Sequence, residues 1–264
     1  MKITVFTSNQ PRHISLIEGL ASIADEVYAV QECATVFPGQ VQDFFKRSAV
    51  MQEYFGHVIE AEKRVFGSPR FSPSKVKALA LKTGDLNRLD INNLYPALQS
   101  DYYVIFGSSY IKGALIDFLV NKRAINIHMG ISPYYRGSNC NFWALYDKKP
   151  DYVGATIHLL SKGLDSGPML FHAVPKEQEV EPFLLGMLSV KSAHNGLLNA
   201  LKTGDILKMD PVPQNKGIEI RYARNDEFND ELALSYLKSM PTKQEIYRSL
   251  KARDLSILLH PYVE

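Results

Sequence analysis

Short apolar runs that alternate with helix-like stretches constrain the fold of this chain more than any other feature of its sequence. An apolar run covers residues 2–7, a helical pattern follows at 14–23, and a second apolar run covers 26–31. This order is typical of βα units around a largely parallel sheet, in which a helix connects each strand to the next. The beginning of the chain therefore predicts the α/β class.

The same alternation returns after residue 100, whereas residues 33–100 show no pattern clear enough to order their elements. Gly204 is predicted to end the last long helix, because glycine adopts the left-handed conformation needed at a helix C-terminus. The segments predicted in this part are the strands 102–106, 124–128, 153–160 and 169–174 and the helices 114–120, 142–146 and 182–201.

A proline-containing stretch at 210–214 predicts a linker after that helix. It divides the chain into a main domain of residues 1–204 and a C-terminal extension of residues 205–264, which is expected to hold a short strand or hairpin and a helical tail. Apolar and polar residues alternate at 218–222, which predicts a half-buried strand. The side chains predicted on its buried face are Ile218, Ile220 and Tyr222.

The composition argues against several classes of function. The 30 basic and 28 acidic residues are mixed along the chain, so no basic face indicates a nucleic-acid partner. Cys33 and Cys140 are too few for a disulfide framework or a metal cluster. No stretch is typical of a signal peptide or a membrane span, so a cytoplasmic protein is expected. The first strand is not followed by Gly-x-Gly-x-x-Gly, which argues against a nicotinamide dinucleotide site.

Chemistry-bearing residues concentrate between Asn126 and Asp165. Asn126 and His128 are two residues apart on a predicted strand, so both side chains project from the same face near its carboxyl end. Asp165 lies in a predicted turn between two strands, from which its carboxylate can reach that strand end. Two other interpretations stay open: a hydrogen-bonded Asn–His pair in the core, and an aspartate that only caps its turn.

Four short motifs, in this order, resemble the folate-dependent formyltransferase family over roughly the first 200 residues. The family includes methionyl-tRNA formyltransferase, glycinamide ribonucleotide transformylase and the nucleotide-sugar N-formyltransferases. Many members have Pro-Ser-Leu-Leu-Pro after the histidine, whereas this chain has Met-Gly-Ile-Ser-Pro at 129–133, which indicates a distinct subgroup. The motifs are Asn-Ile-His at 126–128, Ser-Pro-Tyr-Tyr-Arg-Gly at 132–137, Gly-Ala-Thr-Ile-His at 154–158 and Asp-Ser-Gly-Pro at 165–168.

The resemblance implies that Asn126, His128 and Asp165 are the catalytic residues of a Rossmann-like formyltransferase fold. Attack of an amine on a formyl carbon develops negative charge on the formyl oxygen, to which Asn126 and a protonated His128 can donate hydrogen bonds. Asp165 can favour the imidazolium and accept the proton of the amine. No metal is required, and His158 and His172 are interpreted as structural.

The formyl donor implied by the resemblance is N10-formyltetrahydrofolate, and the matching pterin site follows the strand at 102–106. Gly107 would let the backbone approach a ligand closely. An ordinary strand-to-helix turn with Ser109 as the helix cap is the alternative. The predicted donor-site residues are Phe106, Gly107, Ser108, Ser109, Tyr110 and Ile111.

The acceptor amine is inferred by exclusion. The short extension of mixed charge argues against tRNA, and the first loop lacks the glycine of the glycinamide ribonucleotide enzymes. The remaining branch acts on nucleotide-linked amino-dideoxy sugars of surface polysaccharides such as lipopolysaccharide O-antigens. Packing of the tyrosines and a solvated Arg224 are the alternatives to substrate contact. The predicted acceptor contacts are Asn9, Tyr134, Tyr135, Arg136, Tyr222 and Arg224.

Other functions also stay open at this point. The amine could be methionyl-tRNA or glycinamide ribonucleotide, or the chain could be a relative that binds ligands without turnover. Formyl-folate hydrolysis is a further reading, although such hydrolases carry an additional N-terminal domain. The only partner expected is a small-molecule substrate, and a homodimer is one option for the assembly.

Overall fold

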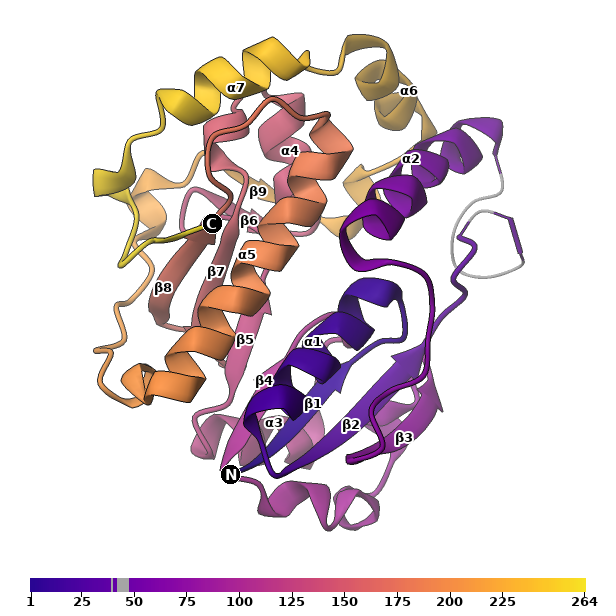
Figure 1. Ribbon diagram of the computed structural model, residues 1–264, viewed down its shortest axis with the longest axis vertical. Helices are drawn as coiled ribbons and strands as arrows, with labels where there is room; N and C mark the ends of the chain where they lie inside the picture. The colour runs from indigo at the N-terminus through magenta and orange to yellow at the C-terminus, as the bar shows by residue number, and fades with distance from the viewer. Residues whose placement is uncertain (39, 42–47) are drawn as a thin grey trace.

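A computed structural model of the chain describes residues 1–38, 40–41 and 48–264. In this part of the chain an eight-stranded sheet has the order β10-β8-β7-β5-β4-β1-β2-β3, and every neighbouring pair that does not include β7 is parallel. The predicted α/β class is confirmed (Figure 1). The strands are β1 (Lys2–Thr7), β2 (Glu26–Cys33), β3 (Val76–Lys82), β4 (Tyr102–Ile105), β5 (Ile125–His128), β7 (Ala155–Leu159), β8 (Met169–Val174) and β10 (Tyr262–Val263).

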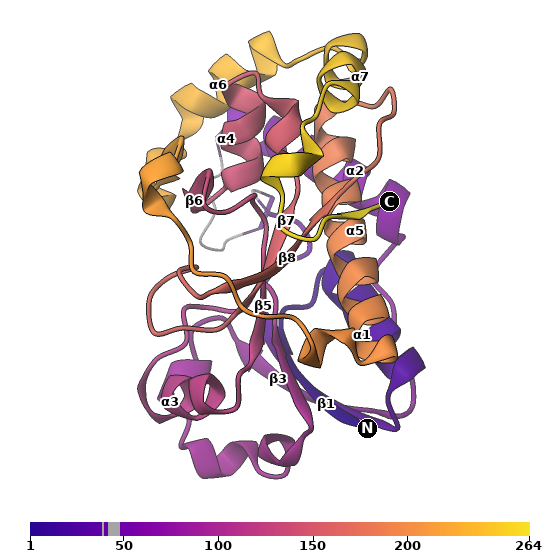
Figure 2. The same ribbon diagram turned by 90° about the vertical axis from the view of Figure 1, so that its left-hand side faces the viewer.

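Helices cover both faces of the sheet, α1 and α5 on one and α3 on the other (Figure 2). The strand alternation explains the two layers, because Val5 packs with the α1/α5 side and Phe6 with the α3 side. No helix in the described residues is long and apolar enough to cross a membrane. The helices are α1 (Pro11–Ile23), α2 (Ala49–Phe66), α3 (Gly113–Asn121), α4 (Cys140–Tyr146), α5 (Pro182–Thr203), α6 (Asp230–Ser239) and α7 (Lys243–Lys251).

Helix α5 links the sheet to a second apolar cluster. Pro182 stands at its first turn, where a missing N–H costs nothing, and Gly204 ends it at φ +75°, as predicted. Leu197 packs into the core under the sheet, whereas Leu185 packs among the residues of α4, α6 and α7. One helix therefore holds the C-terminal helices against the sheet.

The segment that the sequence pattern left unordered contains α2 and the edge strand β3. Ser48 caps α2 by accepting a hydrogen bond from the backbone of Met51. The helix packs against α5 and α6. Strand β3 pairs with β2 but is exposed along most of its length. Its apolar run at 78–81 consists of alanine and leucine, which favour helices, so the sequence does not indicate a strand there.

The C-terminal extension joins the main sheet. Strand β10 pairs with β8, and Val212 forms an isolated bridge with Met169. The prediction of a strand at 218–222 is wrong in its bounds and in which side chains it buries. Strand β9 (Arg221–Ala223) pairs with β6 (Tyr135–Gly137) and buries Ala223, which turns the preceding apolar side chains outward. Those side chains are Ile218, Ile220 and Tyr222, exposed at 45%, 40% and 48%.

Candidate active site

A cavity of about 520 Å³ opens beyond the carboxyl ends of β4 and β5, where open α/β sheets bind ligands. We call its two parts the strand end and the helix end. The strand end consists of the loop at 106–111 together with Asn126, His128 and Asp165. The helix end consists of Arg12, Tyr54, Phe142, Phe183 and Tyr236.

Strand β5 places Asn126 and His128 at the cavity. The intervening Ile127 packs into the core on the other face, so the alternation of the strand turns both polar side chains to one side. Both are more than nine-tenths buried. The predicted same-face arrangement is therefore observed.

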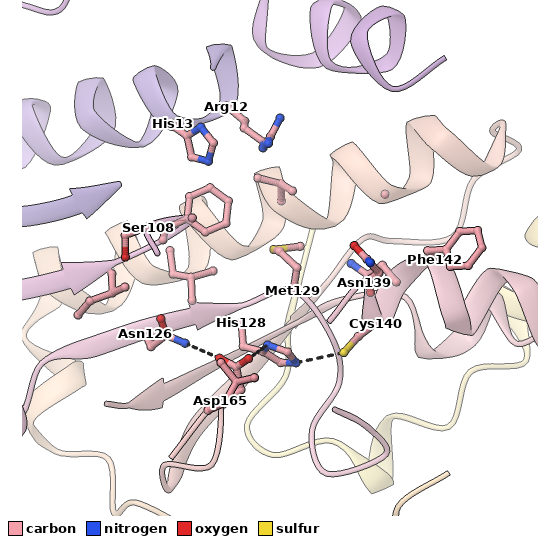
Figure 3. Close-up of a pocket in the computed structure, with 18 of the residues that line it drawn as sticks. Arg12, His13, Ser108, Asn126, His128, Met129, Asn139, Cys140, Phe142 and Asp165 are labelled. Atoms are coloured by element: carbon pink, nitrogen blue, oxygen red, sulfur yellow. Dashed lines mark hydrogen bonds and ion pairs between the residues drawn. The ribbon is translucent and has the colours of Figure 1, made fainter. Parts of the chain in front are cut away.

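Asp165 reaches this strand end from the turn between β7 and β8. Its Oδ2 lies 3.2 Å from His128 Nδ1, and its Oδ1 accepts a hydrogen bond of 3.1 Å from Asn126 Nδ2 (Figure 3). The backbone of Asp165 has φ +42°, and a side chain at Gly167 would collide with the carbonyl of Leu159. The turn is thus shaped to bring the carboxylate back to β5.

The turn is held by a residue of the C-terminal extension. The Nε2 group of Gln214 donates hydrogen bonds of 2.8 Å to the carbonyl of Asp165 and 2.9 Å to that of Gly167. Gln214 was predicted only as part of a linker. The extension therefore helps to position a candidate catalytic carboxylate.

His158 also belongs to this cluster, although the sequence pattern predicted only a structural role for it. Its Nε2 lies 2.9 Å from Asn126 Nδ2, and its Nδ1 lies 2.8 Å from the carbonyl of Leu159. Since a carbonyl only accepts, Nδ1 carries the proton and Nε2 accepts from the amide. This bond orients Asn126. The antiparallel register, which places His158 opposite Asn126, is the signal that could have revealed it. His172, in contrast, contacts the backbone of Ser132 and Leu259.

The buried His128–Asp165 pair is charged. Burial by itself lowers the pKa of His128, but the Asp165 carboxylate, with a contribution from Cys140, raises it well above its ordinary value. Burial raises the pKa of Asp165, but the imidazolium and its hydrogen bond hold that pKa well below the usual range. The arrangement is an imidazolium–carboxylate pair at the cavity.

The loop at 106–111 lines the cavity with all six predicted residues. Gly107 has φ +73°, and a side chain there would come within 2.5 Å of His13 Nε2, so only glycine fits. The buried Glu32 holds the loop by accepting hydrogen bonds from the backbone of Ser109 at 2.6 Å and of Gly84 at 2.7 Å. Ser109 is not the cap of α3, because that position is occupied by Lys112.

The six residues predicted to contact the acceptor lie outside the cavity lining. Tyr135 is buried and donates to Asp147, whereas Arg136 pairs with Glu219 at 2.8 Å. The Tyr135 hydroxyl and the Arg136 Nη1 group are thus used within the fold. The other four have these positions: Tyr134 donates to Ile257, Asn9 exchanges hydrogen bonds with the backbone of Ala34, Tyr222 is exposed, and the backbone of Arg224 binds Glu227.

The helix end was missed by sequence reasoning. Arg12, the one arginine or lysine among the described residues of the lining, pairs at 2.9 Å with the buried Glu62. It faces the strand end across the cavity (Figure 3). Tyr54 and Phe183 are in ring contact at 5.1 Å, as are Phe142 and Tyr236. The five residues of the helix end come from five separate helices, so no local sequence motif predicts them.

No group of three or more histidine, cysteine or acidic side chains suited to a metal ion occurs within residues 1–38, 40–41 and 48–264. The chemistry that the described side chains can perform is hydrogen-bond donation from an amide and an imidazolium, and proton transfer to a carboxylate. That combination suits a reaction in which a carbonyl oxygen becomes negative while an amine loses a proton.

Comparison with protein families agrees with this geometry. Residues 1–180 match the family model described as formyl transferase. The chain belongs to that family. Among curated relatives, the methionyl-tRNA formyltransferase of Thermosynechococcus vestitus is 33% identical over 126 residues, which are 45% of this chain and 38% of that enzyme. That of Trichodesmium erythraeum is 25% identical over 61% of this chain and 50% of its own length. The chain thus spans half or less of these relatives.

Solved structures share the fold of this family member. The formyltransferase PseJ from Anoxybacillus kamchatkensis, solved with UDP-4,6-dideoxy-4-formamido-L-AltNAc and tetrahydrofolate, superposes with a TM-score of 0.51 at 15% identity, over 95% of this chain and all of that one. A 4-N formyltransferase from Francisella tularensis gives a TM-score of 0.51 at 20% identity, over 93% of this chain and 86% of that one.

Proposed function

We propose that this formyltransferase family member moves the formyl group of N10-formyltetrahydrofolate to the amine of a nucleotide-linked amino-dideoxy sugar. The observation that carries the proposal is the position of Asn126, His128 and Asp165 at one cavity with the loop at 106–111. The acceptor class is supported by the formyltransferase PseJ, which was solved with a UDP-linked formamido sugar and superposes over 95% of this chain.

The strand end fits the folate. Glu32 holds the residues after Gly107 in place through the backbone of Ser109, so a flat pterin could be bound by main-chain groups of this loop. The donor supplies the formyl group. The protein has to orient that group toward Asn126 and His128.

The residues of β5 then stabilise the reaction. As the amine attacks, His128 donates its Nε2–H to the formyl oxygen, and Asn126 exchanges its hydrogen bond to Asp165 for one to that oxygen. Each such donor contributes roughly 10²- to 10³-fold in rate. Asp165 accepts the proton that the amine loses, either directly or through water. The bond between the formyl carbon and N10 then breaks, and N10 takes up a proton as tetrahydrofolate leaves. The buried ion pair supplies a charged donor without reorganisation.

The helix end fits the remainder of the acceptor. Tyr54 and Phe183 offer partly exposed aromatic surface for a sugar or a base, and the part of the Arg12 guanidinium that does not bind Glu62 offers donors for a phosphate. Such an acceptor would serve the synthesis of surface polysaccharides, including lipopolysaccharide O-antigens. Because nucleotide sugars and folates are water-soluble, we place the reaction in the cytoplasm.

Formylation of methionyl-tRNA is the second candidate, because the curated relatives named above carry that function. The described C-terminal segment speaks against it. After Gly204 the chain folds back onto the main sheet through β10, and its charges are mixed rather than gathered for a phosphate backbone.

A two-acceptor assay tests the proposal. The purified enzyme is given formyl-folate with a panel of amino-sugar nucleotides or with methionyl-tRNA, and products are scored by the mass gain of one formyl group. We expect formylation of an amino-sugar nucleotide that is lost in the His128→Asn variant. Formylation of methionyl-tRNA with no activity on any amino-sugar nucleotide would refute the acceptor class and leave formyl transfer intact.

A further inference from the structure

Cys140 contacts the edge of His128 that Asp165 leaves free. Its Sγ lies 3.4 Å from His128 Nε2, opposite the nitrogen that faces the carboxylate (Figure 3). Cys140 begins α4, lines the cavity and is 1% exposed. The imidazole therefore has a protein partner at each nitrogen.

The hydrogen bonds of Cys140 define the direction of this contact. Its thiol donates to the carbonyl of Gly137, 3.3 Å away. The S–H is used in that bond, so a sulfur lone pair is directed to the imidazole and accepts from Nε2–H. An imidazolium with Nδ1–H toward Asp165 and Nε2–H toward sulfur satisfies all three groups.

Gly130 makes the contact possible. A side chain at position 130 would lie 2.4 Å from Cys140 Cβ and 2.9 Å from His128 Nε2, which is between the two groups. The glycine at residue 130 and the cysteine at residue 140 are thus sterically matched.

We propose that Cys140 is a positioning residue, which holds the Nε2 edge of His128 so that the imidazole is fixed at both nitrogens. This inference rests on the proposed function, because it assigns a partner to the imidazole taken there as catalytic. Sulfur is a weak acceptor, so it can orient Nε2–H and still release it to the formyl oxygen. Cys140 would then prepare the donor without competing strongly with the substrate.

The groups that face His128 decide its protonation. Asp165 contacts it from the turn after β7, and Cys140 contacts it from α4. The ring centroid of His158 lies 6.4 Å from that of His128. The His158 Nε2 lies 2.9 Å from Asn126 Nδ2 and 3.9 Å from Asp165 Oδ1, so it faces the amide and the carboxylate. The carboxylate and the sulfur therefore both favour the imidazolium.

The test is a pH titration of His128 by ¹⁵N nuclear magnetic resonance in the full chain. The imidazole signals are assigned by their loss in His128→Asn, and Cys140→Ala is compared with Cys33→Ala, the matched control at the other cysteine. We expect the titration midpoint to move to lower pH in Cys140→Ala and to stay at the wild-type value in Cys33→Ala. Cys140→Ser, which keeps a hydrogen-bonding atom, should retain part of the difference.

Gly130→Ala provides a second route, since its methyl group would separate the sulfur from Nε2 without removing either. This variant should also lower the titration midpoint of His128. If Cys140→Ala fails to fold, Gly130→Ala tests the role of Cys140 in its place. A wild-type midpoint in the folded variant would overturn the proposal and make Cys140 a packing residue. The measurement needs neither donor nor acceptor, so it is independent of the amine that is formylated.

Activity offers a further readout once an acceptor is known. Removal of the sulfur should move the alkaline limb of the kcat/KM profile to lower pH. At the alkaline end kcat/KM should fall about tenfold, which is a fraction of what an acid–base group contributes. At the acidic end, where the imidazole is protonated in both proteins, the rates should agree. A uniform loss at every pH would contradict a role in the protonation of His128.

Discussion

The two ends of the cavity are built in different ways. The strand end takes its side chains from β5 and from the two loops at 106–111 and 163–168, each a short contiguous motif. The helix end takes one residue from each of five helices, and the first and last of these residues, Arg12 and Tyr236, are 224 positions apart in the chain. The proposed chemistry is thus locally encoded, whereas the proposed recognition depends on how the helices pack.

This difference suggests how relatives can diverge. Strand ends are fixed by the register of a central sheet, which tolerates little change because its side chains are buried on both faces. Helices at the surface can change their exposed or cavity-facing residues with less effect on the core. Substitutions at the two ends of the cavity should therefore differ in which kinetic constant they change as well as in the size of the change.

The largest effect is expected for His128→Asn at the strand end. The variant loses the charged donor and should reduce formyl transfer by at least about 10³-fold, because a buried neutral amide cannot replace an imidazolium. Circular dichroism and thermal unfolding would check that the fold survives. His260→Asn, at an exposed histidine, is the matched control, and near-normal turnover in His128→Asn would remove His128 from the mechanism.

Asp165→Asn should be nearly as damaging, with a loss of about 10²- to 10³-fold in kcat. An asparagine cannot accept the proton of the amine, and it leaves the imidazole without its counter-charge. Burial then dominates and lowers the pKa of His128 below its ordinary value. A loss of only a few-fold would mean that Asp165 is merely a turn residue.

The same variant should reverse the pH dependence of stability. In the wild type the pKa of His128 is raised, so its stabilising contribution is complete below the unfolded value of about 6.5 and is lost as the pH rises through the folded value. Asp165 has a lowered pKa, so its contribution is lost only as the pH falls through that value. Urea unfolding should show wild-type stability falling as the pH rises above about 6.5. In Asp165→Asn stability should rise with pH below about 6.5 and stay level above it, and parallel curves would contradict the ion pair.

A smaller effect, on binding rather than turnover, is expected at the helix end. Tyr54→Leu should raise the KM of the acceptor by about tenfold, since one aromatic contact is removed, and should leave the KM of formyl-folate unchanged. Steady-state kinetics with each substrate varied in turn would measure this. Tyr247→Leu, on α7 and outside the cavity lining, is the control. Equal changes in both KM values would erase the proposed division of the cavity.

The smallest effect is expected for Gln214→Ala, which connects the extension with the strand end. Loss of the two hydrogen bonds to the turn should lower kcat by a few-fold and leave both KM values unchanged, because Asp165 is still present but less well held. Substitution of the neighbouring exposed Asn215 provides a comparison at the same surface. An unchanged kcat would show that the turn holds its shape without the extension.

Much of the site could be predicted from the sequence alone. The alternation of β5 determined that Asn126 and His128 share a face, and the glycines at 107 and 204 determined two places where the backbone takes a left-handed conformation. These are local properties, because strand periodicity and glycine conformation depend on neighbouring residues rather than on distant ones. The four family motifs are short for the same reason.

Tertiary structure decided the rest. His158 joins Asn126 only through the antiparallel register of β7, and Tyr236 reaches the cavity only because α6 packs against α2. Tyr135 looks available in the sequence, yet the fold buries it against Asp147. Which way a side chain points, which group it binds and whether it reaches the cavity depend on residues far away in the chain. Short sequence patterns therefore predict the strand end of the cavity, whereas the helix end depends on how the helices pack.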